Sequence, residues 1–153
     1  MKTGSTKRVL AVASGGGHWI QLSRMFSAFT DCDVAFLTTQ SSYHYKVSPA
    51  RFYVVHDANL RKKFAMLWMA FQILLVLLWE RPDVVISTGA APGFFALRIG
   101  KLLGAKTIWV DSMANVEQLS ASGMKIGRHA DLWLTQWPHL ATPSGPHYEG
   151  AVL

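Results

Sequence analysis

The chain has 153 residues, of which 50% are apolar and 16% charged, so we expect one globular domain and exclude a disordered chain. Lys and Arg outnumber Asp and Glu by 15 to 9, and the net charge of +6 favours an anionic partner such as phosphate groups or an acidic membrane surface. The basic residues form no single tract, zinc-finger spacing is absent, and Cys32 is the only cysteine. We therefore expect no nucleic-acid partner, no intrachain disulfide and a reducing compartment.

The expected elements alternate between strands and helices. In chain order they are a polar lead-in at Met1–Lys7, a strand at Arg8–Ala13, a helix at His18–Phe29, a strand at Asp33–Thr38, a loop at Gln40–Ala50, a strand at Arg51–Val55, a helix at Leu60–Glu80, a strand at Asp83–Ile86, a helix at Pro92–Leu103, a strand at Lys106–Val110, a short helix at Asn115–Gly123, a strand at Asp131–Thr135 and an irregular tail from Pro138. This order predicts an α/β fold, a doubly wound and mainly parallel Rossmann-like sheet, in one domain over residues 1–153. The first apolar run is too short for a signal peptide, so none is expected.

Two glycine-rich turns, Ser14–His18 and Ser87–Gly93, each follow a predicted strand and precede a predicted helix. Glycine lets backbone N–H groups approach a ligand closely, and a helix N-terminus adds positive partial charge. Turns that follow parallel strands open at one edge of the sheet. We therefore expect an anion, a phosphate or a diphosphate, to be bound there by Ser14, Gly15, Gly16, Gly17, Thr88, Gly89 and Gly93. Neither turn fits the dinucleotide or P-loop pattern, so a plain tight connection is the alternative.

Several polar side chains are expected at the same edge. His18 begins the first helix and is a candidate general base or phosphate ligand, with an exposed helix-start residue as the alternative. Asp111 follows the fifth strand and is a candidate acceptor of a proton from a sugar hydroxyl, or else a loop or cap carboxylate. The further candidates on these connections are Ser112, Asn115, Glu117 and Trp137. The histidines lack metal-ligand spacing, so no metal and no cofactor are expected.

The segment Phe64–Trp79 has sixteen residues without a charge, somewhat fewer than the ~20 that span a bilayer. A helix that covers one face of a sheet is normally polar on its outer side, whereas this one is apolar all round. The basic run Arg61-Lys62-Lys63 precedes it, and Trp68 and Trp79 suit the level of lipid headgroups. We expect the helix to lie in the membrane interface or beneath a partner subunit, with a buried core helix as the alternative.

Four segments together carry a resemblance to a known family. They are SGGGHWIQL in the first turn, STGAAPG in the second, WVDSMANVEQLSASGMKIGRHADLWLTQWPHL from Trp109 to Leu140, and the ending GPHYEGAVL. The chain resembles, over almost its whole length, the PssD-type subunits of bacterial exopolysaccharide glycosyltransferases. It is also similar to the membrane-anchor subunit of the eukaryotic dolichol-linked N-acetylglucosaminyltransferase and to the N-terminal half of MurG. The resemblance implies the acceptor-side domain of a GT-B enzyme, with the UDP-sugar bound by a separate PssE-type subunit.

The resemblance also implies roles for particular residues. The first turn with His18 matches the family's acceptor-side loop, which meets the lipid-linked diphosphate or the transferred group, and the second turn matches another loop of the cleft. In the eukaryotic branch we expect Glu at position 111 and a basic residue at position 115. Asp111 and Asn115 therefore side with the bacterial branch. The eukaryotic anchor begins with a transmembrane helix that this chain is not expected to have, so Phe64–Trp79 would supply the membrane attachment.

The sequence thus predicts the acceptor-binding subunit of a two-component UDP-sugar glycosyltransferase at the cytoplasmic face of the inner membrane. It would extend a polyprenyl-diphosphate-linked saccharide in exopolysaccharide biosynthesis, with His18 as the first candidate base and Asp111 as the second. The bacterial relatives suggest glucuronic acid, and glucose, galactose and N-acetylglucosamine stay open. The alternatives are a non-catalytic anchor that recruits the sugar-nucleotide subunit, and a free-standing Rossmann-like oxidoreductase. The missing G-x-G-x-x-G motif and the lack of an acidic residue after the second strand speak against the oxidoreductase.

Overall fold

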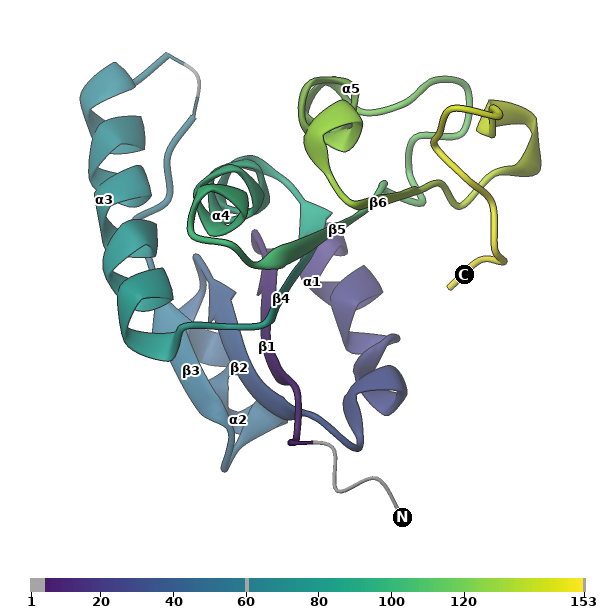
Figure 1. Cartoon of the computed structure of the whole chain (residues 1–153). Helices are drawn as coiled ribbons and strands as arrows, with labels where there is room; N and C mark the ends of the chain where they lie inside the picture. Colours follow the sequence, from purple (N-terminus) through teal and green to yellow (C-terminus); the bar gives the residue numbers. More distant parts are fainter. Residues whose placement is uncertain (1–4, 60, 153) are drawn as a thin grey trace.

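The computed structural model describes residues 5–59 and 61–152, and in it the strands form one parallel sheet in the order β3-β2-β1-β4-β5-β6 (Figure 1). The strands are β1 (Arg8–Ala13), β2 (Asp33–Thr38), β3 (Arg51–Val54), β4 (Val84–Gly89), β5 (Lys106–Val110) and β6 (Leu132–Leu134). The chain crosses from β3 at one edge back to β4 beside β1, so the strand order reverses between these two central strands. The predicted doubly wound, parallel, Rossmann-like sheet is confirmed, and the ligand cleft of such sheets opens at this reversal.

Helices cover both faces of the sheet. The α-helices are α1 (Gly17–Ser23), α2 (His44–Val47), α3 (Lys63–Glu80), α4 (Ala91–Leu102) and α5 (Ala121–Ile126). Short 3-10 turns are η1 (Phe26–Phe29), η2 (Ser41–Tyr43), η3 (Gly127–His129) and η4 (Pro138–Leu140). Figure 1 shows α3, α4 and α5 on one side of the strands and α1 on the other.

The alternation of residues along β1 explains the two layers. Leu10 and Val12 point to the core under α3 and α4, whereas Val9, Ala11 and Ala13 point to the core under α1. Successive side chains of a strand face opposite sides of the sheet, so an unbroken apolar run fits a strand that is buried on both faces. On the α1 side the core is aromatic, and its fully buried Trp19 stacks on Tyr43 with ring centroids 4.8 Å apart.

Three predicted elements differ from the structure. The first helix is interrupted after Ser23 and resumes as the turn η1. The prediction of a loop over Gln40–Ala50 is wrong, because η2 and α2 form there and their Tyr43 and Val47 pack in the core of the α1 side. The short helix is also misplaced: it begins at Ala121, where the side chain of Ser120 caps it by accepting from the Gly123 N–H at 2.8 Å.

Several boundaries also differ, by one residue each at the end of β3, at the start of β4, at both ends of α4 and at both ends of β6. The strand β4 continues through Ser87, Thr88 and Gly89, three small residues that the sequence had placed in the second glycine turn. The helix α3 begins at Lys63, and the predicted first residue Leu60 lies outside the described residues, as do residues 1–4 of the predicted lead-in.

The inner face of α3 belongs to the core of the domain. Met69, Ile73 and Leu77 are at most 2% exposed and pack on the sheet. At the end of the helix, Glu80 accepts two hydrogen bonds from Arg51 Nε at 2.9 and 3.1 Å and one from the Tyr53 hydroxyl at 2.5 Å. These contacts tie the last turn of α3 to the edge strand β3, so α3 is held along its whole length.

Candidate functional site

The first glycine loop is held in place by backbone and side-chain contacts across the reversal point. The Ser14 N–H donates to the carbonyl oxygen of Gly89 at 2.8 Å, which links the ends of β1 and β4. The Gly15 N–H donates to Thr39 Oγ1 at 3.2 Å, and the Gly16 N–H donates to the Tyr43 hydroxyl at 3.0 Å. Three of the N–H groups predicted to meet an anion, those of Ser14, Gly15 and Gly16, are therefore already bonded within the protein. The free donors left to this loop are those of the first turn of α1, which begins at Gly17.

The position of His18 is set by the second strand of the cleft. His18 Nδ1 lies 2.9 Å from the carbonyl oxygen of Thr88, and Thr88 Oγ1 donates to the carbonyl oxygen of His18 at 2.7 Å. A carbonyl oxygen only accepts, so Nδ1 carries the proton and the neutral ring keeps a lone pair on Nε2. The ring packs on Gly89, where a Cβ would lie 2.6 Å from Nδ1. The structure thus brings His18, Thr88 and Gly89 together with Nε2 available, the arrangement a general base needs.

Gly93 has a packing role that the sequence did not indicate. It lies in the first turn of α4, buried against the sheet, and a Cβ there would stand 1.9 Å from Ser87 Oγ and 3.2 Å from Trp109. The contact of Gly93 with a phosphate stays a prediction, because this packing concerns its Cα, and its backbone N–H belongs to the first turn of α4. Its lack of a side chain lets α4 approach β4 and β5 closely, as the last glycine of a dinucleotide-binding turn does.

The Asp111 carboxylate supports the neighbouring loop. The residue is 1% exposed, and its oxygens accept from the Ser120 hydroxyl at 2.5 Å, from the Ser120 N–H at 2.9 Å and from Trp109 Nε1 at 3.4 Å. These bonds anchor the residue that caps α5. Gln21 of α1 reaches the same loop, donating to the Asp111 carbonyl and accepting from the Met113 N–H. Since its oxygens are occupied and buried, Asp111 acts as a positioning residue, and the predicted contact with a sugar hydroxyl finds no open oxygen.

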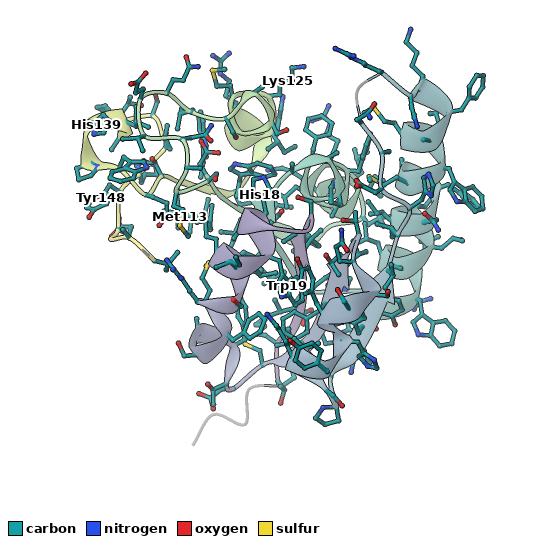
Figure 2. All side chains as sticks on the ribbon, turned by 180° about the vertical axis from the view of Figure 1, so that it is seen from behind. His18, Trp19, Met113, Lys125, His139 and Tyr148 are labelled. Carbon is teal, nitrogen blue, oxygen red and sulfur yellow. The ribbon has the colours of Figure 1, made fainter. Side chains whose placement is uncertain are left out.

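The other candidates between β5 and η4 lie farther along this loop. Ser112 is nearly buried, and its Oγ accepts from the Ala114 N–H at 3.2 Å. Asn115 is half-buried and Glu117 is exposed, both on turns before α5 and not on a helix. Trp137 is half-buried and donates from Nε1 to the Met113 carbonyl at 3.1 Å, so it braces the loop. Figure 2 shows Met113 and His139 on this side of the molecule, with His18 at the top of α1.

A small polar cavity of about 240 Å³ opens between the first glycine loop and the start of α4. Ser14 and Gly15 line one wall, Ala90, Ala91 and Pro92 line the opposite wall, and Thr39, Gln40 and Asp57 complete it. We call this cavity the glycine cleft; His18 lies beside it. Sequence reasoning missed Asp57, whose exposed carboxylate follows β3. Its signal was its place after a strand of the parallel sheet: Asp57 follows β3, and Thr39 and Gln40 follow β2, which lies between β3 and β1.

The outer face of α3 is an exposed apolar stripe along the full helix. Its members recur every three or four residues: Phe64, Leu67, Trp68, Phe71, Leu75, Leu78 and Trp79. Phe64 is 88% and Trp79 79% exposed, and the Arg61-Lys62-Lys63 run before the helix is exposed as well. In the described part of the chain, α3 is the one helix whose length and composition would allow it to cross a membrane. Because these outer side chains are exposed, the alternative of a core helix buried on all sides is wrong, and the outer half of α3 needs cover.

The comparisons with known proteins agree with this picture. Residues 31–152 match the model of a family described as "Oligosaccharide biosynthesis protein Alg14 like". The chain is 33% identical over 114 residues to the UDP-N-acetylglucosamine transferase subunit alg14 of Schizosaccharomyces pombe, covering 69% of this chain and 53% of that protein. It is 36% identical over 68 residues to the ALG14 subunit of Yarrowia lipolytica, covering 40% of this chain and 32% of that protein. The chain therefore matches about half or less of the length of these relatives.

Solved structures share the fold. MurG of Acinetobacter baumannii aligns with a TM-score of 0.77 at 16% identity, over 93% of this chain and 45% of that one. The UDP-N-acetylglucosamine 2-epimerase of Rickettsia bellii aligns with a TM-score of 0.73 at 15% identity, over 96% of this chain and 45% of that one. At these identities the likeness shows the fold, which corresponds to less than half of either protein.

Proposed function

The chain belongs to the family of Alg14-like oligosaccharide biosynthesis proteins, and from this premise we propose that it is the acceptor-binding, membrane-associating subunit of a two-component glycosyltransferase. The donor would be a UDP-sugar, and the acceptor a saccharide linked to polyprenyl diphosphate. The observation that carries the proposal is the pairing of the cleft at the β1–β4 reversal with the exposed apolar stripe of α3. The cleft suits a polar substrate and the apolar stripe suits a lipid phase. A lipid-linked sugar has a polar part and an apolar part.

The proposed partner is a PssE-type subunit that binds the UDP-sugar. The names of both yeast relatives describe them as transferase subunits, which supports a partner chain for this protein too. The fold shared with MurG supports a GT-B arrangement for the complex, in which the proposed partner would supply the facing domain. In the complex, the partner would face the carboxyl edge of the sheet, where the glycine loop and His18 lie.

Membrane association would occur through α3 lying in the plane of the cytoplasmic leaflet. Met69, Ile73 and Leu77 fix the inner face of α3 in the core, so a helix inserted across the bilayer would leave that core uncovered. The opposite face, from Phe64 to Trp79, would enter the boundary between headgroups and acyl chains. The Arg61-Lys62-Lys63 run would lie on anionic lipid. This geometry supports a monotopic attachment, and we propose the cytoplasmic face of the inner membrane as its place.

In the proposed reaction, His18 is the general base. Its Nε2 takes the proton of the acceptor hydroxyl while the hydroxyl oxygen forms a bond to the anomeric carbon of the donor sugar. The bond from that carbon to the UDP oxygen breaks, and UDP leaves with the electron pair. Thr88 holds the ring and its tautomer through the Nδ1 contact of 2.9 Å. The N–H groups at the start of α1 and of α4 would face the phosphates.

The sugar and the pathway belong to the finer part of the proposal. Asp111 and Asn115 support a PssD-type, exopolysaccharide enzyme, for which we propose glucuronic acid as a donor sugar. The names of the yeast relatives favour N-acetylglucosamine. Both UDP-sugars therefore belong in the first assay.

The test is co-purification of the chain with the product of a neighbouring reading frame, followed by turnover of UDP-glucuronic acid and UDP-N-acetylglucosamine on polyprenyl-diphosphate acceptors. Activity from the mixture, and from neither chain alone, is the expected result. Turnover by this chain alone would contradict a split enzyme. If His18→Ala retains full activity in the mixture, His18 is not the base; a helix-deleted form that still supports transfer to a soluble acceptor would speak against the alternative of a non-catalytic anchor.

A further inference from the structure

A groove of about 840 Å³ lies next to the glycine cleft and is lined by residues from the start of α3, the start of α4 and α5. We call it the α3–α5 groove; its lining includes Met66, Phe94, Phe95, Ala121, Arg61 and Lys125. Its volume lies in the range of about 300–1,000 Å³ that is usual for small-molecule sites. Its aromatic residues belong to none of the features described above: they are not part of the candidate base, the glycine loops or the outer stripe of α3.

The walls of the groove are apolar and firmly packed. Phe94 and Phe95 are half-buried, both rest on the main core, and their rings meet edge to face with centroids 5.5 Å apart. Met66 from the first turns of α3 faces the same space, with Ala91 and Ala121 as small residues at its ends. Such a surface favours a hydrocarbon chain and offers few partners to a polar ligand.

The groove connects the two regions that the proposed function needs. Ala58, Ala90 and Ala91 line both the groove and the glycine cleft. Arg61 lines both the groove and a surface hollow formed with Lys62, Lys63 and Phe64 at the start of α3. A molecule lying in the groove would therefore run from the membrane-facing helix to the polar cleft.

Charge sets the orientation of that molecule. Lys125 and Arg61 are exposed cations, and neither forms an ion pair within residues 5–59 and 61–152. Figure 2 shows Lys125 on α5 at the carboxyl end of the sheet. The carboxylate Asp57 lies in the glycine cleft, where it opposes an anion and suits the hydroxyl groups of a sugar. An anionic group is thus favoured at the groove, and an uncharged polar group in the cleft.

We infer that the α3–α5 groove holds the isoprenoid units next to the diphosphate of the acceptor. The diphosphate lies between Lys125, Arg61 and the start of α4, and the first sugar of the acceptor enters the glycine cleft. The inference rests on the proposed function and deepens it, because it gives the lipid its own site on the domain in addition to the bilayer.

The first experiment measures binding to the whole chain by isothermal titration calorimetry, with farnesyl diphosphate and inorganic diphosphate as probes. Farnesyl diphosphate is expected to bind about tenfold more tightly or better, which corresponds to burying roughly two methylene groups. Equal affinities would overturn the inference, since the groove would then take no hydrocarbon chain.

Two variants separate the two halves of the site. Ala121→Trp places a bulky ring in the groove from an exposed position, and it is expected to abolish the preference for farnesyl diphosphate while leaving inorganic diphosphate binding unchanged. Lys125→Gln is expected to weaken both probes by a similar factor. Lys106→Gln, the same change at an exposed site at the start of β5, is the matched control and should alter neither. Unchanged preference in Ala121→Trp would contradict the site.

A competition experiment tests whether the groove prefers an isoprenoid diphosphate to a phospholipid. Dihexanoyl phosphatidic acid carries acyl chains and a phosphate but no isoprenoid diphosphate, and it should displace farnesyl diphosphate poorly. Displacement at equal concentrations would show a general phospholipid site and overturn the inference. Failure of the inference is distinct from failure of the proposed function. In the first case the mixed subunits still transfer sugar and Ala121→Trp has wild-type activity; in the second case no acceptor is used at all.

Discussion

The two edges of the sheet differ in their ion pairs. At the amino edge three basic residues are paired, Arg8 with Asp83, Arg51 with Asp33 and Glu80, and Lys101 with Asp131, whereas Lys106 at the start of β5 has no such partner among the described residues. Residues 5–59 and 61–152 contain no other ion pairs. At the carboxyl edge, Arg61, Lys62, Lys63 and Lys125 have no such partner among those residues. The ion pairs of the described residues thus all lie at the amino edge, and the cations around the cleft and the start of α3 have no carboxylate partner there.

The difference separates stability from binding. The strongest pairing, around Glu80, leaves that side chain 7% exposed and holds the pKa of Arg51 above its usual range through hydrogen bonds to Glu80 and Asp33. Burial, together with the hydrogen bond to Glu80, raises the pKa of Tyr53 to about 12. Charges satisfied in this way hold β3 and α3 together and offer little to a ligand. The unpaired cations at the other edge contribute little to folding and remain available to anions.

The largest expected effect concerns the carboxyl edge. His18→Ala should lower sugar transfer by the mixed subunits by about 10²–10⁴-fold, the usual contribution of a general base, with the melting temperature and partner binding unchanged. The measurement is the initial rate of sugar transfer as a function of pH, for the wild-type chain and for His18→Ala. His129→Ala, an exposed histidine just before β6 at the amino edge, is the control and should keep full activity. A similar loss in both variants would contradict a specific role for His18.

The next effect concerns the outer face of α3. The double variant Phe64→Ser, Trp79→Ser should weaken binding to anionic vesicles by about a hundredfold or more, because each ring would contribute roughly 1.5 kcal/mol or more on entering the interface. Flotation or sedimentation with vesicles of phosphatidylglycerol measures it. Tyr45→Ser, at a side chain of α2 that is 76% exposed on the other side of the sheet, should bind vesicles normally. Wild-type flotation of the double variant would favour a protein partner on this stripe.

A third effect tests the amino edge. Glu80→Gln should reduce the free energy of unfolding by about 1–3 kcal/mol, because the nearly buried carboxylate accepts hydrogen bonds from Arg51 and Tyr53. Urea denaturation followed by tryptophan fluorescence measures the change. Asp83→Asn, which breaks an exposed pair, should cost less. Neither variant should alter vesicle binding; a loss of binding with full stability would break the separation between the two edges.

The smallest effect is that of a single cation before α3. Lys62→Gln should weaken binding to anionic vesicles by about fivefold, corresponding to ~1 kcal/mol for one basic residue near the surface. The difference should shrink as salt is added, since the Debye length falls to ~3 Å at 1 M. Binding at rising salt concentration measures it, with Lys106→Gln as the control at the far edge. A loss that persists at high salt would point to something other than surface charge.

The strands were predicted well because their signal is local. The ranges predicted for β1, β2 and β5 coincide with the structure, since each is a short apolar run bounded by polar residues or glycine. The prediction stopped β4 at Ile86, because Ser87 and Thr88 resemble turn residues when their burial under α4 is unknown. The prediction of a loop before α2 was wrong for a similar reason, because Tyr43 forms a helical turn there, where the ring of Trp19 is available for stacking.

The candidate residues show the same difference between local signals and contacts made in the folded protein. Placing His18 and the first glycine loop at the ligand edge needed only the order of a strand, a turn and a helix. Asp57 was missed because only the position of β3 in the sheet brings it to the site. The contacts of Gly93 with Ser87 and of Asp111 with Ser120 gave these two residues structural roles that the sequence did not indicate. Those contacts bring together residues from different elements.

By itself, the sequence determined the alternation of strands and helices, the apolar composition of α3 and the family resemblance, because each is a property of consecutive residues. Only the tertiary structure decided which face of α3 is exposed, which cations are paired and which polar groups line the glycine cleft. Those features depend on strand order and on the register of packing across the sheet. Residues such as Gly15 and Asp57, or Arg51 and Glu80, become neighbours only after the chain has crossed the sheet.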